Sequence, residues 1–271
     1  MLKGGLCRLE EHVESFLFIE IKSYGYAVLT ICREPVNSMN LDLWRQLSAA
    51  LESLEADPNV RGLIFQSGLK RDVFTAGNDL RELYAPESSA ERYQDFWVTQ
   101  NTFLAKLYRT RLATVAAIRG ACPAGGCALA LCCDYRVMSE EGNIGLNEVV
   151  LGIPVPEYWT MLMQRTVGQR HAERLLPYGL MPSAEEALKI GLVDALVPTA
   201  QLPQASEEAL MKMLKVSDAA RHPTKSHLRG NFSKAWQEFC VKEAEFGWKL
   251  ISHPNTVEAI EGVLQRLSKS S

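Results

Sequence analysis

Two short loops in this sequence combine glycine with the start of a predicted helix. The first loop, Phe74 to Leu80, follows one predicted strand, and the second, Gly120 to Gly126, follows another. The first N–H groups of a helix have no partner inside the helix, and the helix dipole adds partial positive charge there. If both loops are aimed at one point, the backbone N–H groups of Asn78 and Gly125 form an oxyanion hole. Ordinary glycine turns of an α/β protein explain the same spacing, and the spacing alone favours that explanation, because such strand–helix loops are common.

Other chemistries find less support in the residue pattern. Neither loop has the glycine order of a P-loop or of a dinucleotide-binding loop. The seven cysteines, four of them between Cys122 and Cys133, lack the paired spacing of a zinc site and have no histidine motif beside them. We therefore predict buried free thiols in a reducing compartment or an organelle matrix, and no metal site.

The elements that position these loops are predicted as a β-α-β succession. Phe16 to Ile21 and Tyr26 to Ile31 form a predicted hairpin, and a helix is expected from Leu41 to Glu55 with Asn40 as its N-cap. The remaining predicted elements are strands at Val60–Gln66, Ala113–Ile118 and Tyr135–Ser139, and a long helix at Ser89–Arg109. Strand, glycine loop, helix and strand in this order predict an α/β fold with a largely parallel sheet.

Beyond Gly152 the pattern becomes helical. The last predicted helices lie at Ser206–Lys215, Trp236–Leu250 and Thr256–Leu267. This change from alternating strands and helices to helices alone predicts an α/β core over residues 1–195 and a helical C-terminal region over residues 196–271.

Composition narrows the classes of partner. The chain has 271 residues, 47% of them hydrophobic and 23% charged, as an ordinary folded protein does. The net charge is −3 with no long basic run, which argues against nucleic acid as the main partner. No apolar stretch reaches the roughly 18 residues that a membrane-spanning helix needs.

Four ordered stretches resemble one known family. Phe74–Leu80, Gly120–Asp134, Ile144–Ile153 and Ala184–Asp194 are similar to the first and second oxyanion loops, the catalytic turn and a downstream signature of the crotonase (enoyl-CoA hydratase/isomerase) superfamily. The similarity runs from about Phe16 to the C-terminus. It implies the ββα spiral fold of that family, with a helical C-terminal trimerisation region. It also implies an acyl-CoA substrate whose thioester oxygen accepts hydrogen bonds from the amides of Asn78 and Gly125.

The number of glutamates distinguishes the reactions within the family. The hydratases that this chain resembles carry two glutamates, one of which corresponds to Ala128 and the other to Glu148. Hydration divides its proton transfers between two carboxylates, whereas moving a double bond requires one base that carries a proton from C2 to C4. Residues 121–127 and 145–148 also resemble Δ3,Δ2-enoyl-CoA isomerases of the mitochondrial type. The resemblance thus implies an isomerase of unsaturated fatty-acid β-oxidation with Glu148 as its base.

Further binding residues follow from the same resemblance. The expected substrate-binding set is Ala76, Gly77, Asp79, Leu80, Asn147 and Arg33. Asp79 is also expected to cap the helix that follows it. Arg33, Lys70, Arg71 and Arg81 are candidate partners of the CoA phosphates, and Trp97 belongs either to the core or to the acyl pocket. No cofactor is expected, because coenzyme A is part of the substrate.

Some alternatives stay open at this point. A hydratase, another acyl-CoA enzyme of the family, or a scaffold that binds CoA or RNA would share much of this sequence. The resemblance favours trimers or hexamers and a mitochondrial matrix location. No targeting signal is visible, because the N-terminus lacks a transit-peptide pattern and the C-terminus is not S-K-L, so the peroxisome and the cytoplasm remain alternatives.

Overall fold

A mixed β-sheet forms the centre of the molecule in the computed structural model, which describes residues 15–269. Its strand order is β1-β2-β3-β4-β6-β8; β1 is antiparallel to β2, and the other neighbouring pairs are parallel. The strands are β1 (Leu17–Lys22), β2 (Tyr26–Ile31), β3 (Gly62–Ser67), β4 (Ala113–Ile118), β6 (Tyr135–Ser139) and β8 (Ala195–Val197). A second, two-stranded sheet joins β5 (Cys122–Pro123) to β7 (Ile144–Gly145). The predicted α/β class, hairpin and parallel sheet are confirmed.

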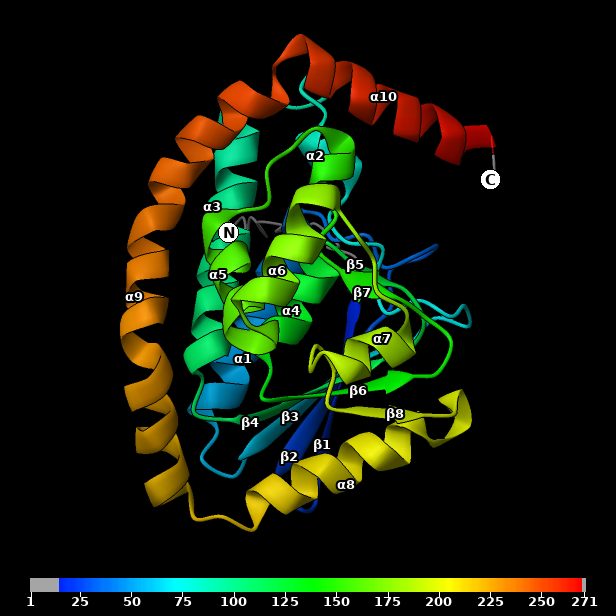
Figure 1. The fold of residues 1–271 in the computed structure, drawn as a ribbon. Helices are drawn as coiled ribbons and strands as arrows, with labels where there is room; N and C mark the ends of the chain where they lie inside the picture. Colours follow the sequence, from blue (N-terminus) through cyan, green and yellow to red (C-terminus); the bar gives the residue numbers. More distant parts are fainter. Residues whose placement is uncertain (1–14, 270–271) are drawn as a thin grey trace, which may run out of the picture.

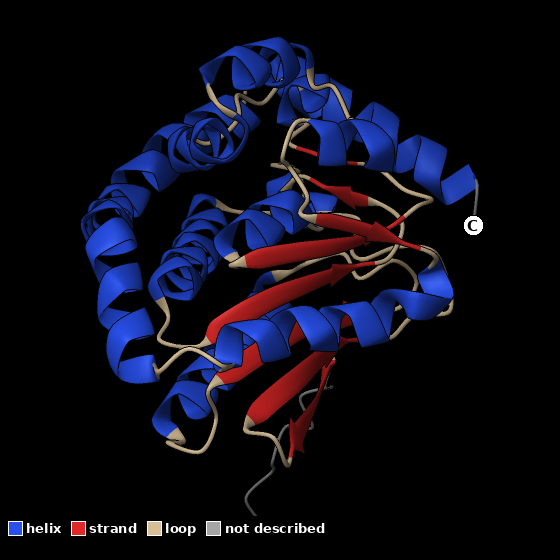
Figure 2. Ribbon diagram, turned by 60° about the horizontal axis from the view of Figure 1, so that its bottom comes forward, coloured by secondary structure: helices blue, strands red, loops and turns tan. Residues whose placement is uncertain are grey.

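Successive side chains along each strand point to opposite faces of the sheet, so the buried side chains form a core on each face. In β3, Leu63 and Phe65 join the main core, while Ile64 faces the other side. That other side is covered by α8 (Leu202–Leu214), whose Leu210 packs against the sheet (Figures 1 and 2). All of β4 is buried, as expected for a strand with helices on both faces.

The main core lies between the sheet and the helices of the opposite face (Figure 1). Helix α1 begins after Asn40, whose side chain accepts a hydrogen bond from the N–H of Leu43 at 3.0 Å, so the predicted cap is confirmed. The helices of this part are α1 (Leu41–Ala56), α2 (Leu80–Leu83), α3 (Ala90–Arg109), α4 (Gly125–Cys132), α5 (Glu157–Val167), α6 (Gln169–Leu175) and α7 (Ala184–Lys189). Short 3₁₀ turns lie at η1 (Glu148–Leu151) before α5, at η2 (Leu176–Tyr178) after α6 and at η3 (Thr199–Gln201) before α8.

The C-terminal helices extend further than the sequence pattern predicts. Helix α9 (Asp218–Ile251) begins eighteen residues before the predicted start at Trp236 and contains Pro223 near its N-terminal end. This early part of α9 is mostly polar and exposed, so hydrophobic periodicity could not reveal it. Helix α9 packs along α3, and α10 (Pro254–Lys269) then turns across the end of the core (Figure 1). The division of the chain at residue 195 stays a prediction.

Candidate active site

The first glycine loop is held against the second by direct backbone packing. Gly77 has a φ of 85°, and a Cβ at this position would lie 3.1 Å from the Pro123 carbonyl oxygen and 3.2 Å from the Ala124 Cβ. Glycine is therefore required for its backbone conformation and for the close approach of the two loops. The Thr75 hydroxyl accepts a hydrogen bond from the Gly77 N–H at 3.0 Å and donates one to the Asn37 carbonyl at 2.6 Å, which fixes the turn.

The second loop is joined to the turn that carries Glu148. Strands β5 and β7 pair, and the Ala124 N–H donates to the Gly145 carbonyl at 2.8 Å. Ala124 has a φ of 50°, an uncommon conformation for a residue with a side chain, and it immediately precedes α4. The loop thereby turns sharply so that Gly125 becomes the first residue of the helix.

Two backbone N–H groups remain free where these loops meet. Over residues 15–269, neither the N–H of Asn78 nor that of Gly125 has a hydrogen-bond acceptor. A Cβ on Gly125 would lie 2.8 Å from the Asn78 Oδ1, so the two residues are in contact. The structure thus brings together the two predicted amide donors, and free donors of this kind can stabilise a developing oxyanion.

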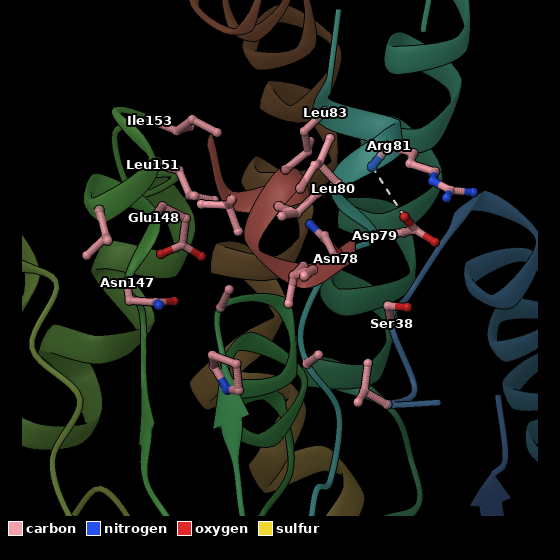
Figure 3. A pocket seen from close by; sticks show the side chains of 18 of the residues that line it. Ser38, Asn78, Asp79, Leu80, Arg81, Leu83, Asn147, Glu148, Leu151 and Ile153 are labelled. Atoms are coloured by element: carbon pink, nitrogen blue, oxygen red, sulfur yellow. Dashed lines mark hydrogen bonds between the residues drawn. The ribbon is translucent and has the colours of Figure 1, made fainter. Parts of the chain in front are cut away.

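Glu148 is the first residue of η1, four positions after the start of β7. The residue is only 9% exposed, and neither carboxylate oxygen has a hydrogen-bond partner within the described part of the chain. Burial raises the pKa of Glu148 to about 7, with a smaller opposing effect from the residue's own backbone amide. Figure 3 shows the carboxylate facing the cavity across from Asn78. A carboxyl group with this pKa can both accept and return a proton near neutral pH.

The cavity has a volume of about 780 Å³ and combines a polar mouth with apolar walls. Ala76, Asn78, Ala124 and Glu148 line it where the two glycine loops meet the turn of Glu148. The apolar walls are formed by Leu80, Leu83, Tyr93, Trp97, Leu151, Ile153, Trp159, Ile251, Val263, Leu264 and Leu267. Helices α9 and α10 therefore contribute to a pocket that is otherwise built by the core. A cavity with apolar walls next to two amide donors and one carboxyl suits an acyl thioester.

Comparisons with known proteins agree with this arrangement. The family model for enoyl-CoA hydratase/isomerase matches residues 22–268. The chain belongs to this family. It is 39% identical over 223 residues to the mouse protein called mitochondrial enoyl-CoA delta isomerase 1, covering 82% of this chain and 75% of the relative. The human protein of that name is 40% identical over 207 residues, covering 76% and 68%.

Solved structures give the same result for the fold. The crystal structure of human mitochondrial Δ3-Δ2-enoyl-CoA isomerase superposes with a TM-score of 0.91 at 34% identity, covering 95% of this chain and 100% of that one. An enoyl-CoA hydratase from Bacillus halodurans superposes with a TM-score of 0.83 at 23% identity, covering 92% and 100%. The crotonase fold predicted from the sequence motifs is therefore confirmed.

Most of the residues expected to bind substrate line the cavity of this crotonase-fold chain. Ala76, Asp79, Leu80, Asn147 and Arg33 lie on its surface, as do Asn78 and Glu148. The glycines at 77 and 125 do not line it, but each is next to a residue that does. Their predicted roles concern backbone atoms and stay predictions, as do the roles of the other site residues.

The charged residues at the mouth divide into paired and unpaired groups. The carboxylate of Asp79 accepts from the N–H of Arg81 at 3.2 Å, which confirms the predicted helix cap, and pairs with Arg33 at 3.0 Å. The same Arg33 nitrogen also donates to the carbonyl and the hydroxyl of Ser38. Arg71 and Arg81 line the mouth and make no ion pair among residues 15–269, whereas Lys70 is not part of the lining. The two unpaired arginines are thus the better candidates for phosphate contact.

The second glutamate position of the hydratase relatives is apolar here. Ala128 lies inside α4 and is fully buried. Among residues 15–269, three carboxylates line the cavity: Glu34 is exposed, Asp79 is paired with Arg33, and Glu148 is buried without a partner. Of these lining groups, Glu148 alone combines burial with an unsatisfied carboxylate.

The cysteines and the pocket walls complete the account of the site. Cys122, Cys127, Cys132 and Cys133 are free and buried, and burial raises the pKa of each thiol, which disfavours the reactive thiolate. No group of three metal-ligating side chains is found within residues 15–269.

The sequence pattern missed the contributions of α9 and α10 to the pocket walls, since helical spacing does not show which distant helix a side chain meets. Trp97, left open between core and pocket, lines the pocket.

Proposed function

We propose that this protein is a Δ3,Δ2-enoyl-CoA isomerase that converts 3-enoyl-CoA to trans-2-enoyl-CoA. The observation that carries the proposal is the buried, unpartnered carboxyl of Glu148 in the same apolar pocket as the oxyanion loops. The similarity to mouse and human enoyl-CoA delta isomerases supports the same activity. The activity belongs to the oxidation of unsaturated fatty acids.

The proposed reaction moves one proton and one double bond. The carboxylate of Glu148 removes a proton from C2, and the electron pair of the C2–H bond spreads over a dienolate that includes the thioester oxygen. The backbone N–H groups of Asn78 and Gly125 donate to that oxygen, and losing one such donor typically raises the barrier by about 2.7–4 kcal/mol. The carboxyl of Glu148 then returns the proton to C4, and the double bond lies between C2 and C3. Substrate and product have the same composition.

The remaining residues bind and orient the substrate in this proposal. The acyl chain lies along the apolar walls, with Asn147 beside the reacting carbons and Ala76, Gly77 and Leu80 along the first loop. Arg71 and Arg81, and to a smaller extent the Asp79-paired Arg33, meet the CoA phosphates at the mouth. Coenzyme A enters as part of the substrate, and the proposed reaction uses no separate cofactor.

Location and assembly are part of the proposal as well. The mouse, rat and human relatives are named as mitochondrial proteins, which supports the mitochondrial matrix as the site of action. Over residues 15–269, no helix is long and apolar enough to cross a membrane. Exposed Leu228, Val241 and Phe246 on α9 support an assembly, a trimer or a pair of trimers, in which the C-terminal helices meet other subunits.

The decisive experiment compares the purified protein with its Glu148→Gln variant on trans-3-hexenoyl-CoA, with the products separated chromatographically. We expect the wild type to form trans-2-hexenoyl-CoA and the variant to lose about 10²- to 10⁴-fold in kcat, because glutamine cannot transfer the proton. KM should change little, since the side chain keeps its size. Far-ultraviolet circular dichroism of both proteins controls for folding.

Other outcomes would contradict the proposal in distinct ways. An active Glu148→Gln variant excludes Glu148 as the base. A 3-hydroxyacyl-CoA or a free acid as the main product indicates a hydratase or a hydrolase. A wild type that binds CoA esters without converting them indicates a binding scaffold, and salt-sensitive retention of RNA indicates an RNA-binding scaffold.

A further inference from the structure

The side chain of Asn78 is paired with a buried glutamine that the proposed reaction does not use. Gln100, on α3, is fully buried and donates from its Nε2 to the Asn78 Oδ1 at 2.7 Å. In return, the Asn78 Nδ2 donates to the Gln100 Oε1 at 3.3 Å. The two carboxamides form a reciprocal pair that connects the first oxyanion loop to the long helix α3.

This carboxamide pair also touches the second oxyanion loop. A Cβ on Gly125 would lie 2.8 Å from the Asn78 Oδ1 and 3.2 Å from the Gln100 Nε2. The pair therefore packs directly on the α-carbon of the residue whose N–H is the second proposed donor. The loops are also joined by the Gly77 packing described above and by a hydrogen bond from the Phe74 N–H to the Ala121 carbonyl at 2.9 Å. The Asn78–Gln100 pair is thus one of the contacts that set the relative position of the two loops.

Burial makes the pairing specific. An amide that is removed from water without a partner is unfavourable, so each of these two side chains restricts the other to one orientation. Asn78 lines the cavity and is only partly buried, whereas Gln100 does not line it and is fully enclosed. Without Gln100, the Asn78 carboxamide loses its protein partner and is free to turn toward the cavity or toward water.

We infer that Gln100 is a positioning residue, which acts through Asn78 to hold the two oxyanion amides at the separation that the enolate requires. The inference rests on the proposed function, because it assigns Gln100 to the same oxyanion hole. The reacting atoms are touched by Asn78 and Gly125, and Gln100 lies one layer behind them. Removing Gln100 therefore changes the geometry of the donors and leaves the binding surface intact.

The test uses Gln100→Met, which keeps the length of the side chain and removes both hydrogen bonds. Gln66→Met is the matched control, because Gln66 also donates one side-chain hydrogen bond, to Thr30 at 3.0 Å, but lies on β3 outside the cavity. We expect Gln100→Met to lower kcat on trans-3-hexenoyl-CoA by about tenfold to a hundredfold, with KM within about twofold of wild type. The Gln66→Met control should keep the wild-type kcat.

A second readout reports on the oxyanion hole without turnover. Acetoacetyl-CoA forms an enolate that absorbs in the near ultraviolet, and two well-placed amide donors favour the bound enolate. A titration with pH gives the apparent pKa of the bound ligand, which should be higher in Gln100→Met than in the wild type or in Gln66→Met. A purely structural role of Gln100 would change melting but not this apparent pKa.

A double variant keeps the inference testable if Gln100→Met does not fold. Asn78→Leu with Gln100→Met replaces both carboxamides by apolar side chains, which avoids an unpaired buried amide. The folded double variant is compared with the wild type: an apparent pKa of bound acetoacetyl-CoA above the wild-type value supports the inference, because the pair is missing, and a wild-type value overturns it. Wild-type kcat and wild-type enolate absorbance in a folded Gln100→Met also overturn it. If the wild type stabilises the enolate in a Gln100-dependent way but does not isomerise hexenoyl-CoA, the proposed function fails and the inference stands.

Discussion

The regions near the two ends of α4 each hold a largely buried carboxylate, and they differ in what surrounds it. In the pocket near the N-terminal end, the oxygens of Glu148 have no hydrogen-bond partner within residues 15–269. Just past the C-terminal end, Asp134 is paired with Lys225 and Arg229, each at 2.8 Å, and accepts a hydrogen bond from the Thr114 N–H at 2.9 Å. Similar burial therefore accompanies opposite electrostatic surroundings.

The two surroundings move the pKa values in opposite directions. Burial raises the pKa of Glu148 above its ordinary value of 4.5 to about 7. Burial alone would also raise the pKa of Asp134, but the charges of Lys225 and Arg229 outweigh it and hold that pKa below the ordinary 3.8. A paired carboxylate stays charged and joins α9 to the core, whereas an unpaired one is available to exchange a proton. The contrast supports a structural role for Asp134 and the proposed proton-transfer role for Glu148, without reference to the family.

The largest expected effect on stability comes from removing the charge of Asp134, which pairs with Lys225 and Arg229. Asp134→Asn removes the charge that compensates two cations, of which Lys225 is 8% exposed. Removing one partner of a buried ion pair typically costs about 3–5 kcal/mol, so the free energy of unfolding should fall by that amount. Chemical denaturation measures the loss, and activity per folded molecule should stay near the wild-type value, because Asp134 does not line the reactive cavity.

A matched surface pair provides the control for this change. Asp218 also pairs with two cations, Arg61 and Arg221, but its side chain is 39% exposed. Asp218→Asn should cost only about 0–1 kcal/mol, because water screens an exposed pair. Equal losses in the two variants would show that burial does not distinguish these carboxylates.

The sequence predicted the parts of this comparison that depend on local pattern. Alternation of apolar residues, helical spacing and turn chemistry predict the hairpin, the parallel strands, the cap at Asn40 and the glycine loops. Motif resemblance points to Glu148 as the expected base and to Ala128 as the position of the second hydratase glutamate. The surroundings of each carboxylate could not be predicted in this way. The ion pair of Asp134 with Lys225 spans ninety-one residues, and the Asn78–Gln100 pair joins a loop to a helix face. The pocket that holds Glu148 likewise includes wall residues from the distant helices α9 and α10.

The pH dependence of the free energy of unfolding tests the raised pKa of Glu148. Between about pH 4.5 and 7 the folded protein keeps the Glu148 proton while the unfolded chain has lost it, so the free energy of unfolding falls as pH rises. The full contribution is about 3 kcal/mol, because each unit of pKa shift corresponds to about 1.4 kcal/mol. Asp134 acts in the opposite sense, since its contribution is lost only as pH falls below 3.8.

The Glu148→Gln variant isolates this contribution. Denaturant midpoints of the wild type and the variant, measured between about pH 5 and pH 8, should diverge, with the variant relatively more stable at the higher pH. Other titrating groups, including the five histidines, are shared by both proteins and cancel in the difference. Parallel curves would mean that Glu148 has an ordinary pKa in the folded protein and is not poised as proposed.

The smallest expected effect concerns the mouth of the pocket, where Arg71 and Arg81 are exposed and form no ion pair among residues 15–269. Arg81 lines the mouth on α2 and forms no ion pair among residues 15–269. Because an exposed charge contributes roughly 0.2–1 kcal/mol, Arg81→Ala should raise KM for hexenoyl-CoA by about twofold to fivefold and leave kcat unchanged. The increase should shrink at high salt, which screens the CoA phosphates. Arg170→Ala, an exposed arginine outside the pocket, should have no effect on KM. An Arg81 effect on kcat instead of KM would place this arginine near the reacting atoms and remove the distinction between a binding mouth and a reactive interior.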